Sequence, residues 1–321
     1  MTDTGPLFVS SGDLIADRRY KWALDQAARG DFVAAADILM QTVTLAPAFA
    51  TAWFTLGAIR DRLGDHSGAI AAFERARDAD PQDYHGARLQ LARLGSGEAT
   101  PPMTETYVRR LFDQYAARYD AALTERLCYR GPALLREAVE QATHAAGHGF
   151  RFSAVLDLGC GTGLGGAAFR SAVARLVGVD LSLAMVAHAQ AKGLYDRLAT
   201  ADVVAFLADE AADGAKYDLA IAADVFVYVN DLAPILAGVA RVLAPGGLFA
   251  FTVETHLGEG VKLLPTLRYA HSESYLRRVL GEAGLAPLSI GKASVRSEKG
   301  LPVDSLVVVA KGGSAPPGDA A

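Results

Sequence analysis

The residues with the clearest chemistry in this 321-residue chain are two acids on either side of a glycine-rich stretch. The apolar run that contains Asp157 stops at Gly159, Gly161 and Gly163, and a second apolar run ends in Asp180 about twenty residues later. Alternating glycines after a buried strand predict a tight turn in which the backbone approaches a ligand closely. A carboxylate at the tip of the next strand suits the hydroxyls of a ribose. The stretch therefore predicts a βαβ unit that binds a ribose-containing ligand.

Two ligand classes use such a turn, dinucleotides and S-adenosylmethionine, and charge helps to choose between them. The chain has no Lys or Arg from Asp157 to Phe169. A carboxylate at Asp157 would repel a pyrophosphate, but it suits a ligand whose ends carry an ammonium and a sulfonium. The spacing is also Gly-x-Gly-x-Gly and not Gly-x-Gly-x-x-Gly. Both observations favour S-adenosylmethionine.

The stretch from residue 157 to 163 reads Asp-Leu-Gly-Cys-Gly-Thr-Gly and resembles the nucleotide loop of class I S-adenosylmethionine-dependent methyltransferases. The resemblance extends over residues 103–311 and implies an α/β fold with a Rossmann-like, seven-stranded sheet. It implies S-adenosylmethionine as the cofactor. It also implies cofactor contacts by Asp157, Gly159, Cys160, Gly161 and Asp180.

The adenosine side of the site is expected in the two segments that follow Asp180. Ser182 is a predicted N-cap, which would place Leu181 and Met185 near the ribose and adenine. Core packing explains Met185 equally well.

A short third strand is expected before Asp202. If the family pattern holds, Asp202 accepts the adenine amino group and the Val203 amide meets the ring. Asp196 and Asp209 are competing acids in the same region.

The fourth apolar strand ends at Asp224, and Val225 follows it. In the methyltransferases that this chain resembles, this position approaches the transferred methyl group, so both residues are expected near the cofactor. Amide and exocyclic-amine methyltransferases tend to carry Asn/Asp-Pro-Pro-Tyr/Phe here, whereas this chain has Asp-Val-Phe-Val. The difference disfavours methylation of a nucleobase or a glutamine.

Two histidines, His256 and His271, lie in the loops expected beyond the fifth strand. Each is a candidate general base, because the pKa of histidine lies near working pH and loops at strand ends hold such groups. The alternative for each is a capping or surface role. Together with Asp224, they are the catalytic candidates.

Aromatic residues at near-helical spacing predict an amphipathic helix over residues 103–129. Its Phe-Asp-x-Tyr-Ala-x-x-Tyr-Asp segment resembles the first helix of methyltransferases of the ubiquinone and menaquinone biosynthesis type. In those enzymes an aromatic residue closes over the cofactor, which implies a lid role for Tyr115 or Tyr119. The alternative is a helix that only covers the sheet.

Residues 16–83 repeat with a period of 34, with Gly30 and Asp31 in register with Gly64 and Asp65. The second copy matches the tetratricopeptide pattern of two helices around a Gly-Asp turn. Trp53 and Phe73 are expected to fill the seam between its helices. Such a module suggests a protein partner bound in a groove; packing or dimerisation is the alternative.

Composition limits the other function classes. The chain is 51% hydrophobic with a formal net charge of −5, so it lacks the positive excess of a nucleic-acid binder. Two isolated cysteines without metal-ligand spacing indicate a reduced cytoplasm, and no apolar run is long enough for a membrane span. The expected organisation is a flexible N-terminus (1–12), two tetratricopeptide repeats with a capping helix (13–95), a linker (96–102), the methyltransferase domain (103–311) and a disordered tail (312–321).

The combination resembles predicted bacterial methyltransferases that carry N-terminal tetratricopeptide repeats. It implies methyl transfer from S-adenosylmethionine to an oxygen or activated carbon of a small-molecule acceptor. One alternative is a protein methyltransferase whose substrate docks on the repeats. Another is a non-catalytic S-adenosylmethionine-binding scaffold. The resemblance supplies no acceptor.

Overall fold

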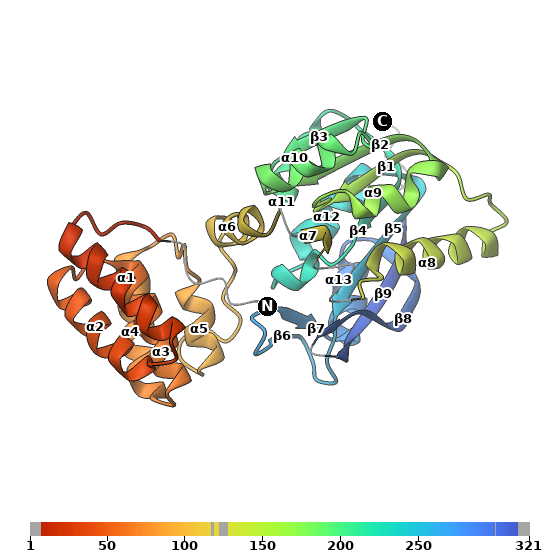
Figure 1. Cartoon of the computed structure of the whole chain (residues 1–321). Coiled ribbons are helices and arrows are strands. Elements are labelled where there is room, and N and C mark those ends of the chain that lie inside the picture. Colours follow the sequence, from red (N-terminus) through yellow and green to blue (C-terminus); the bar gives the residue numbers. More distant parts are fainter. Residues whose placement is uncertain (1–7, 117–118, 122–127, 299, 314–321) are drawn as a thin grey trace, which may run out of the picture. The chain divides into compact units, whose positions relative to one another are not determined.

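The computed structural model describes residues 8–116, 119–121, 128–298 and 300–313 (Figure 1). They form two compact units: one runs to Tyr107 and includes Leu263–Leu267, and the other comprises Val108–Lys262 and the residues from Arg268 onward. The predicted tail beyond residue 313, the first seven residues and part of the helix predicted over 103–129 lie outside the described residues.

The first unit is helical and shows the same turn twice. Its helices are α1 (Leu14–Ala28), α2 (Phe32–Leu45), α3 (Ala50–Arg62), α4 (His66–Ala79) and α5 (Ala87–Arg93). Gly30 and Gly64 have φ angles of 85° and 82°, the left-handed region that glycine enters without strain. Asp31 and Asp65 then cap α2 and α4 through their side chains. The Gly-Asp pairs of the repeat are therefore the turns that join the two helices of each pair.

Close packing between α3 and α4 depends on a glycine. A Cβ on Gly57 would lie 2.8 Å from the Phe73 ring, so only glycine lets the two helices approach this far. Phe73 is fully buried, as expected. Trp53 is instead partly exposed, and its indole N–H donates to the Pro47 carbonyl at 2.8 Å. Phe73 therefore fills the seam, while Trp53 lies at its edge.

A mostly parallel sheet is the centre of the second unit. Its strands are β1 (Phe152–Leu158), β2 (Val173–Asp180), β3 (Arg197–Thr200), β4 (Tyr217–Ala222), β5 (Leu243–Glu254), β6 (Val261–Leu263), β7 (Tyr269–His271), β8 (Leu285–Glu298) and β9 (Leu301–Gly312). Seven of them follow in the order β3-β2-β1-β4-β5-β9-β8, with the first five parallel and β9 antiparallel to both of its neighbours. The predicted Rossmann-like sheet is confirmed. The short strands β7 and β6 extend it beyond the carboxyl end of β5, where Glu254 pairs with Ala270.

The terminal hairpin is longer than the sequence suggested. The apolar runs of residues 285–295 and 303–310 predict a pair of strands, but β8 continues to Glu298 and β9 begins at Leu301. The extra residues pair across the hairpin, with Glu298 opposite Leu301. This extension places Arg296 and Glu298 on a strand instead of in a loop.

Helices cover both faces of the sheet (Figure 1). The helices that follow residue 104 are α6 (Glu105–Tyr115), α7 (Tyr119–Ala121), α8 (Gly131–Ala145), α9 (Leu164–Phe169), α10 (Leu183–Ala191), α11 (Val203–Ala212), α12 (Ala233–Val242) and α13 (Glu273–Glu282), with 3₁₀ turns η3 (Arg170–Ala172) and η4 (Phe226–Tyr228). Side chains of α11, α12 and α13 share one buried cluster with Phe249 and Phe251 of β5. Those of α8 and α9 share the other with Ala250 of the same strand. Successive residues of β5 thus face opposite sides, as its pleat requires.

Within the part of the chain that the structure describes, no helix combines the length and apolarity needed to cross a membrane.

Candidate active site

The glycine loop begins where β1 ends and leads into α9. Gly159, Gly161 and Gly163 have φ angles of 61°, 53° and 93°, which other residues adopt only with strain. A Cβ on Gly159 would lie 2.6 Å from a methyl carbon of Val225. The loop backbone therefore packs directly against the segment that follows β4, and the two predicted halves of the site meet at this contact.

Asp180, at the tip of β2, holds this loop in place. Its Oδ2 accepts a hydrogen bond from the Gly161 N–H, and its Oδ1 accepts one from the Ser182 N–H, each at 2.9 Å. The Cys160 N–H donates to the Val179 carbonyl at 2.9 Å. Burial raises the pKa of Asp180, and the two N–H groups act in the opposite direction. Each carboxylate oxygen keeps a second lone pair, so Asp180 suits the predicted contact with ribose hydroxyls.

Asp157 differs from its expected position. Its carboxylate is only 1% exposed and accepts a hydrogen bond from the Tyr195 hydroxyl at 2.6 Å. The same hydroxyl accepts from the Gly166 N–H at 3.2 Å. Burial raises the pKa of Asp157 to about 7. Asp157 thus supports the loop from beneath, with Tyr195 as a partner that the sequence did not suggest, and its contact with the cofactor stays a prediction.

The turn after β2 brings Leu181 and Met185 to the start of α10. Ser182 is the N-cap as predicted, and its hydroxyl accepts from the Met185 N–H at 3.1 Å. Met185 is fully buried, which agrees with a packing role, while Leu181 is partly exposed. The Leu181 carbonyl accepts from Arg109 Nε at 3.4 Å. Contacts of both side chains with the adenosine stay a prediction.

Asp202 lies directly after β3, at the carboxyl edge of the sheet. It caps α11, with Oδ1 accepting from the N–H groups of Val204 and Ala205 at 2.8 and 3.0 Å. Val203 is the first residue of that helix. Asp196 precedes β3 and thus lies at the other end of the strand. Of these two acids, Asp202 is the one at the edge that carries the glycine loop.

The segment that contains α6 and α7 is tied to both loops of the cofactor side. Asp113 Oδ1 accepts from the Ser182 hydroxyl at 2.5 Å. Asp120 accepts from the Thr162 hydroxyl of the glycine loop and, at 2.6 Å, from Lys192 Nζ at the end of α10. These contacts hold the described part of the predicted helix against the β1–α9 and β2–α10 connections.

One of the two aromatic residues expected to close over the cofactor lies at the glycine loop. A Cβ on Gly161 would be 3.8 Å from the Tyr119 ring. The Phe112 ring packs edge-on against Tyr119 at 6.2 Å and against Tyr228 at 5.0 Å. Tyr115 is partly exposed on the last turn of α6. The geometry therefore favours Tyr119 for the lid role.

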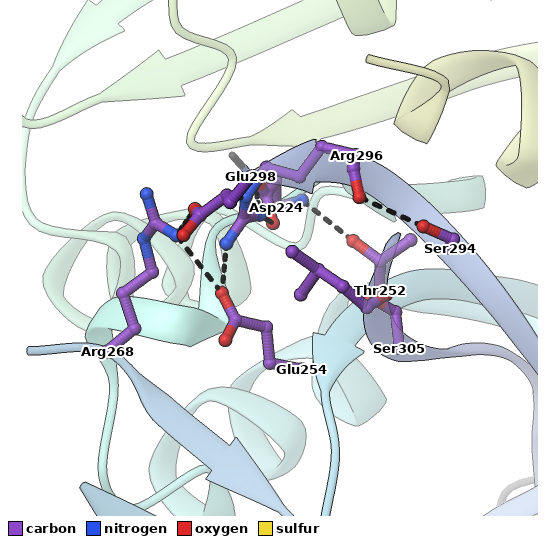
Figure 2. A network of polar contacts seen from close by, with 9 residues as sticks. Asp224, Thr252, Glu254, Arg268, Ser294, Arg296, Glu298 and Ser305 are labelled. Carbon is purple, nitrogen blue, oxygen red and sulfur yellow. Dashed lines mark hydrogen bonds and ion pairs between the residues drawn. The ribbon is translucent and has the colours of Figure 1, made fainter. Parts of the chain in front are cut away.

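A network of buried charges lies at the end of β4, where the resemblance places the transferred methyl (Figure 2). Arg296 Nη1 donates to both oxygens of Asp224, its Nη2 donates to Glu254, and its Nε donates to Glu298 at 3.2 Å. Arg268 Nη1 contacts Glu254 at 3.4 Å and also pairs with Glu298. The network joins three carboxylates to two guanidinium groups, and the Arg296 side chain is 1% exposed.

Asp224 occupies a strained backbone position within this network. Its φ angle is 62°, which non-glycine residues seldom adopt and which clusters at functional sites. The Asp224 N–H donates to the Thr252 hydroxyl at 2.8 Å, and the paired guanidinium of Arg296 holds the side chain. Backbone and side chain are thus both fixed by neighbouring strands.

Electrostatics within the network favour ionised groups. Burial by itself would lower the pKa of Arg296, but Asp224 and Glu254 raise it above its ordinary value. Burial also opposes ionisation of Glu298, yet Arg268 and Arg296 lower its pKa. For Glu254 burial dominates and raises the pKa in spite of both guanidinium groups.

The two candidate histidines differ in their hydrogen bonds, and a role as general base stays a prediction for both. His271 is fully buried, its Nε2 lies 3.0 Å from the Val229 carbonyl, and burial lowers its pKa to about 4. Its Nδ1 is buried and has no hydrogen-bond partner among the described residues. His256 Nδ1 accepts from the Gly258 N–H at 3.0 Å, and its Nε2 donates to the Gly260 carbonyl at 3.3 Å, so its own loop occupies both of its nitrogens.

The main residues that sequence reasoning missed are Arg296 and Glu298. They lie two positions apart on β8, so both project from the same face of that strand. Their alternation with buried Val295 was a strand signal, but it did not indicate which distant acids they would meet.

Family comparisons agree with this geometry. Residues 156–249 match a family model described as a methyltransferase domain, and residues 50–83 match the tetratricopeptide repeat model. The first match covers β1 to β5, and the second covers α3 and α4.

Curated relatives include the malonyl-[acyl-carrier protein] O-methyltransferase of Pseudescherichia vulneris, which is 37% identical over 141 residues, 42% of this chain and 52% of that protein. Methyltransferase-like protein 27 of Homo sapiens is 35% identical over 108 residues, 33% of this chain and 42% of that protein. The chain thus spans about half the length of the curated relatives it matches.

Among solved structures, the 1,6-didemethyltoxoflavin-N1-methyltransferase of Burkholderia thailandensis, with bound 1,6-didemethyltoxoflavin and S-adenosylhomocysteine, superposes with a TM-score of 0.50. It is 21% identical and covers 64% of this chain and 88% of that chain. At this identity the likeness establishes the fold.

The fold and the glycine loop define the second unit as a class I methyltransferase domain. Residues 156–249 therefore carry a methyltransferase domain, and residues 50–83 carry a tetratricopeptide repeat. The prediction of the fold class is confirmed, and the comparisons agree with the predicted enzyme class and cofactor.

Proposed function

We propose that this protein transfers the methyl group of S-adenosylmethionine to an oxygen or activated carbon of a small-molecule acceptor. The observation that carries the proposal is the contact between Gly159 and Val225. It joins the loop that would hold the cofactor to the segment that begins with Asp224. A cofactor held by this loop would therefore lie beside the buried charge network.

The residues on the cofactor side fit S-adenosylmethionine. Asp180 has lone pairs for the ribose hydroxyls, and Asp202 and Val203 lie at the carboxyl edge of the sheet, where the adenine is expected. When bound, the cofactor supplies an electrophilic methyl group. Tyr119 would cover it and exclude water. Positioning of this kind can contribute on the order of 7 kcal/mol or more to lowering a barrier.

A small-molecule acceptor is favoured by two features. The chain has Asp-Val-Phe-Val after β4 in place of the Pro-Pro motif of amide methyltransferases. One relative is named malonyl-[acyl-carrier protein] O-methyltransferase, so transfer to an oxygen has a precedent among the relatives. The second candidate is methylation of a protein that docks on the helical unit, and the repeat match at residues 50–83 supports it.

Labelled transfer separates these two candidates. A cell extract is split by size into macromolecules and small molecules, and each fraction is incubated with the full-length protein and methyl-labelled S-adenosylmethionine. Label in the small-molecule fraction is expected. Label only in protein would favour docking, and no label in either fraction would contradict methyl transfer.

The cofactor side is tested by calorimetry with S-adenosylhomocysteine. Asp180→Ala should weaken binding at least about tenfold, because it removes the acceptor of the Gly161 and Ser182 N–H groups and of the ribose. Asp209→Ala, at an exposed acid on α11, is the control and should bind as the wild type does. Undiminished binding by Asp180→Ala would refute this assignment.

A further inference from the structure

The buried network that includes Asp224 contains more acidic than basic side chains. It contains the carboxylates of Asp224, Glu254 and Glu298 and the guanidinium groups of Arg268 and Arg296, which leaves one negative charge in excess when all five groups are ionised. Every N–H-bearing nitrogen of Arg296 already contacts a carboxylate. The network therefore holds no spare positive charge at Arg296 for an incoming anion.

Among the residues that the structure describes, the other groups that interact with Asp224 do not supply the missing charge. Tyr119, Tyr129 and Tyr228 interact with Asp224, and burial raises the pKa of each, so their hydroxyls are neutral at pH 7. Burial keeps His271 neutral as well. On the cofactor side lies a further carboxylate, Asp180. The acceptor side of the site is accordingly negative.

We propose that the acceptor presents an uncharged, proton-bearing nucleophile, a hydroxyl or an enol, and that Asp224, positioned by Arg296, receives its proton. This inference rests on the methyl transfer proposed above. It places a carboxylate acceptor, such as the malonyl group in the name of one relative, outside the substrate class of this protein.

Charge balance supports a proton-bearing acceptor. With the cofactor bound, the sulfonium offsets the negative excess of the network. The acceptor oxygen, or the carbon of an enol, forms a bond to the methyl carbon as the carbon–sulfur bond breaks and leaves its electron pair on sulfur. The sulfonium charge is lost, and the hydroxyl proton passes to Asp224, which cancels one negative charge. The network and cofactor together are therefore neutral before and after transfer.

A carboxylate acceptor would lack this balance. It would bring a second unpaired negative charge into a site that is already short of cations, and desolvation of an unpaired charge is costly. Arg296 is 1% exposed, and to bind that carboxylate it would have to release one of its present partners.

Asp224 is the member of the network best placed to take the proton. Its side chain is 14% exposed, against 3% for Glu254, and unlike Glu298 on β8, which is 23% exposed, it lies just after β4, at the strand end that faces the glycine loop. Arg296 is a positioning residue, since it holds both carboxylate oxygens of Asp224 and has no exposed surface of its own to offer a substrate.

Base treatment of the labelled products tests the acceptor class directly. Methyl esters formed on carboxylates release volatile methanol in alkali, whereas methyl ethers and C-methyl products do not. Small molecules labelled by the full-length protein are expected to keep their label. Release of the label as methanol would overturn this inference but leave methyl transfer intact, whereas failure to label any fraction would contradict the proposed function itself.

Cofactor binding tests the negative excess without an acceptor. The wild type should bind S-adenosylmethionine more tightly than neutral S-adenosylhomocysteine. Glu254→Gln should reduce that ratio about fivefold, the size expected for one unit charge several ångströms away at intermediate dielectric. Glu298→Gln removes the charge of a more exposed acid of the network and should also reduce this ratio of affinities. It replaces Glu254→Gln in the test if Glu254→Gln does not fold.

Glu282→Gln is the matched control, because Glu282 is an exposed acid on α13 paired only at the surface with Arg278. Its binding ratio should equal that of the wild type. Equal ratios for the wild type and for both network variants would show that the network does not act on the sulfonium charge, and would overturn the inference.

Discussion

The two halves of the site are built in opposite ways. On the cofactor side, Asp180 holds a loop by hydrogen bonds to backbone N–H groups, and the residues involved lie within one βαβ unit. On the acceptor side, the network joins side chains of four different segments, and Asp224 and Arg296 are 72 residues apart. Backbone contacts make the first half tolerant of side-chain identity apart from its glycines and acids. The second half depends on every charged side chain having its partner.

Removing Arg296 should have the largest effect. Arg296→Ala would leave Asp224 and Glu254 without their main partner in a buried position, which costs about 3–5 kcal/mol. Urea denaturation would measure the change in the free energy of unfolding. Arg278→Ala removes a surface pair with Glu282 and should cost less than about 1 kcal/mol. Similar losses in the two variants would contradict the contrast between the two halves.

On the cofactor side, alanine substitutions at two glycines allow the cost of backbone strain to be measured separately from the cost of a steric clash. Gly159 and Gly193 have φ angles of 61° and 62°, but only at Gly159 would a Cβ meet another side chain, that of Val225 at 2.6 Å. Gly193→Ala should therefore cost about 1 kcal/mol from backbone strain alone. Gly159→Ala should cost about 1–3 kcal/mol more and weaken binding of S-adenosylhomocysteine. Equal thermal stabilities of the two variants would show that the Val225 side chain moves aside without an energetic cost.

The buried acid beneath the loop should make stability depend on pH. The pKa of Asp157 is raised to about 7 in the folded protein and lies near 3.9 in the unfolded chain, so between these values the folded state binds the extra proton. The free energy of unfolding should then fall as pH rises from about 4 to about 7, by at most about 1.4 kcal/mol per pH unit.

The variant Asp157→Asn should lose this slope, and Asp209→Asn on the surface of α11 should keep it. Denaturation of all three proteins at pH 5 and pH 6 gives the comparison. Parallel curves for the wild type and Asp157→Asn would contradict the raised pKa.

The smallest effect is expected at His256. Because both ring nitrogens of His256 are bonded within its own loop, His256→Ala should change the rate of methyl transfer by less than about threefold. A general base typically contributes a hundredfold or more. A loss of that size, with the fold intact by circular dichroism, would identify His256 as a catalytic residue.

Much of the fold could be predicted because its signals are local. The Gly-Asp turns of the repeats, the N-cap at Ser182 and the terminal hairpin each follow from the preferences of a few adjacent residues. Local signals did not suffice where the outcome depended on a distant partner. Asp157 is buried because Tyr195 lies beside it, and β8 continues to Glu298 because β9 pairs with it that far.

The sequence by itself determined the glycine loop and the acid at the tip of β2, and with them the methyl donor. Positive φ angles and close backbone approach require glycine, so the residue type alone marks these positions in the sequence. Only the tertiary structure decided the acceptor side. An arginine on the last hairpin and acids at the ends of β4 and β5 become partners because antiparallel pairing of β9 with β5 and β8 brings them together. A guanidinium ion is stable in that buried position only when carboxylates surround it, and no local pattern specifies which ones.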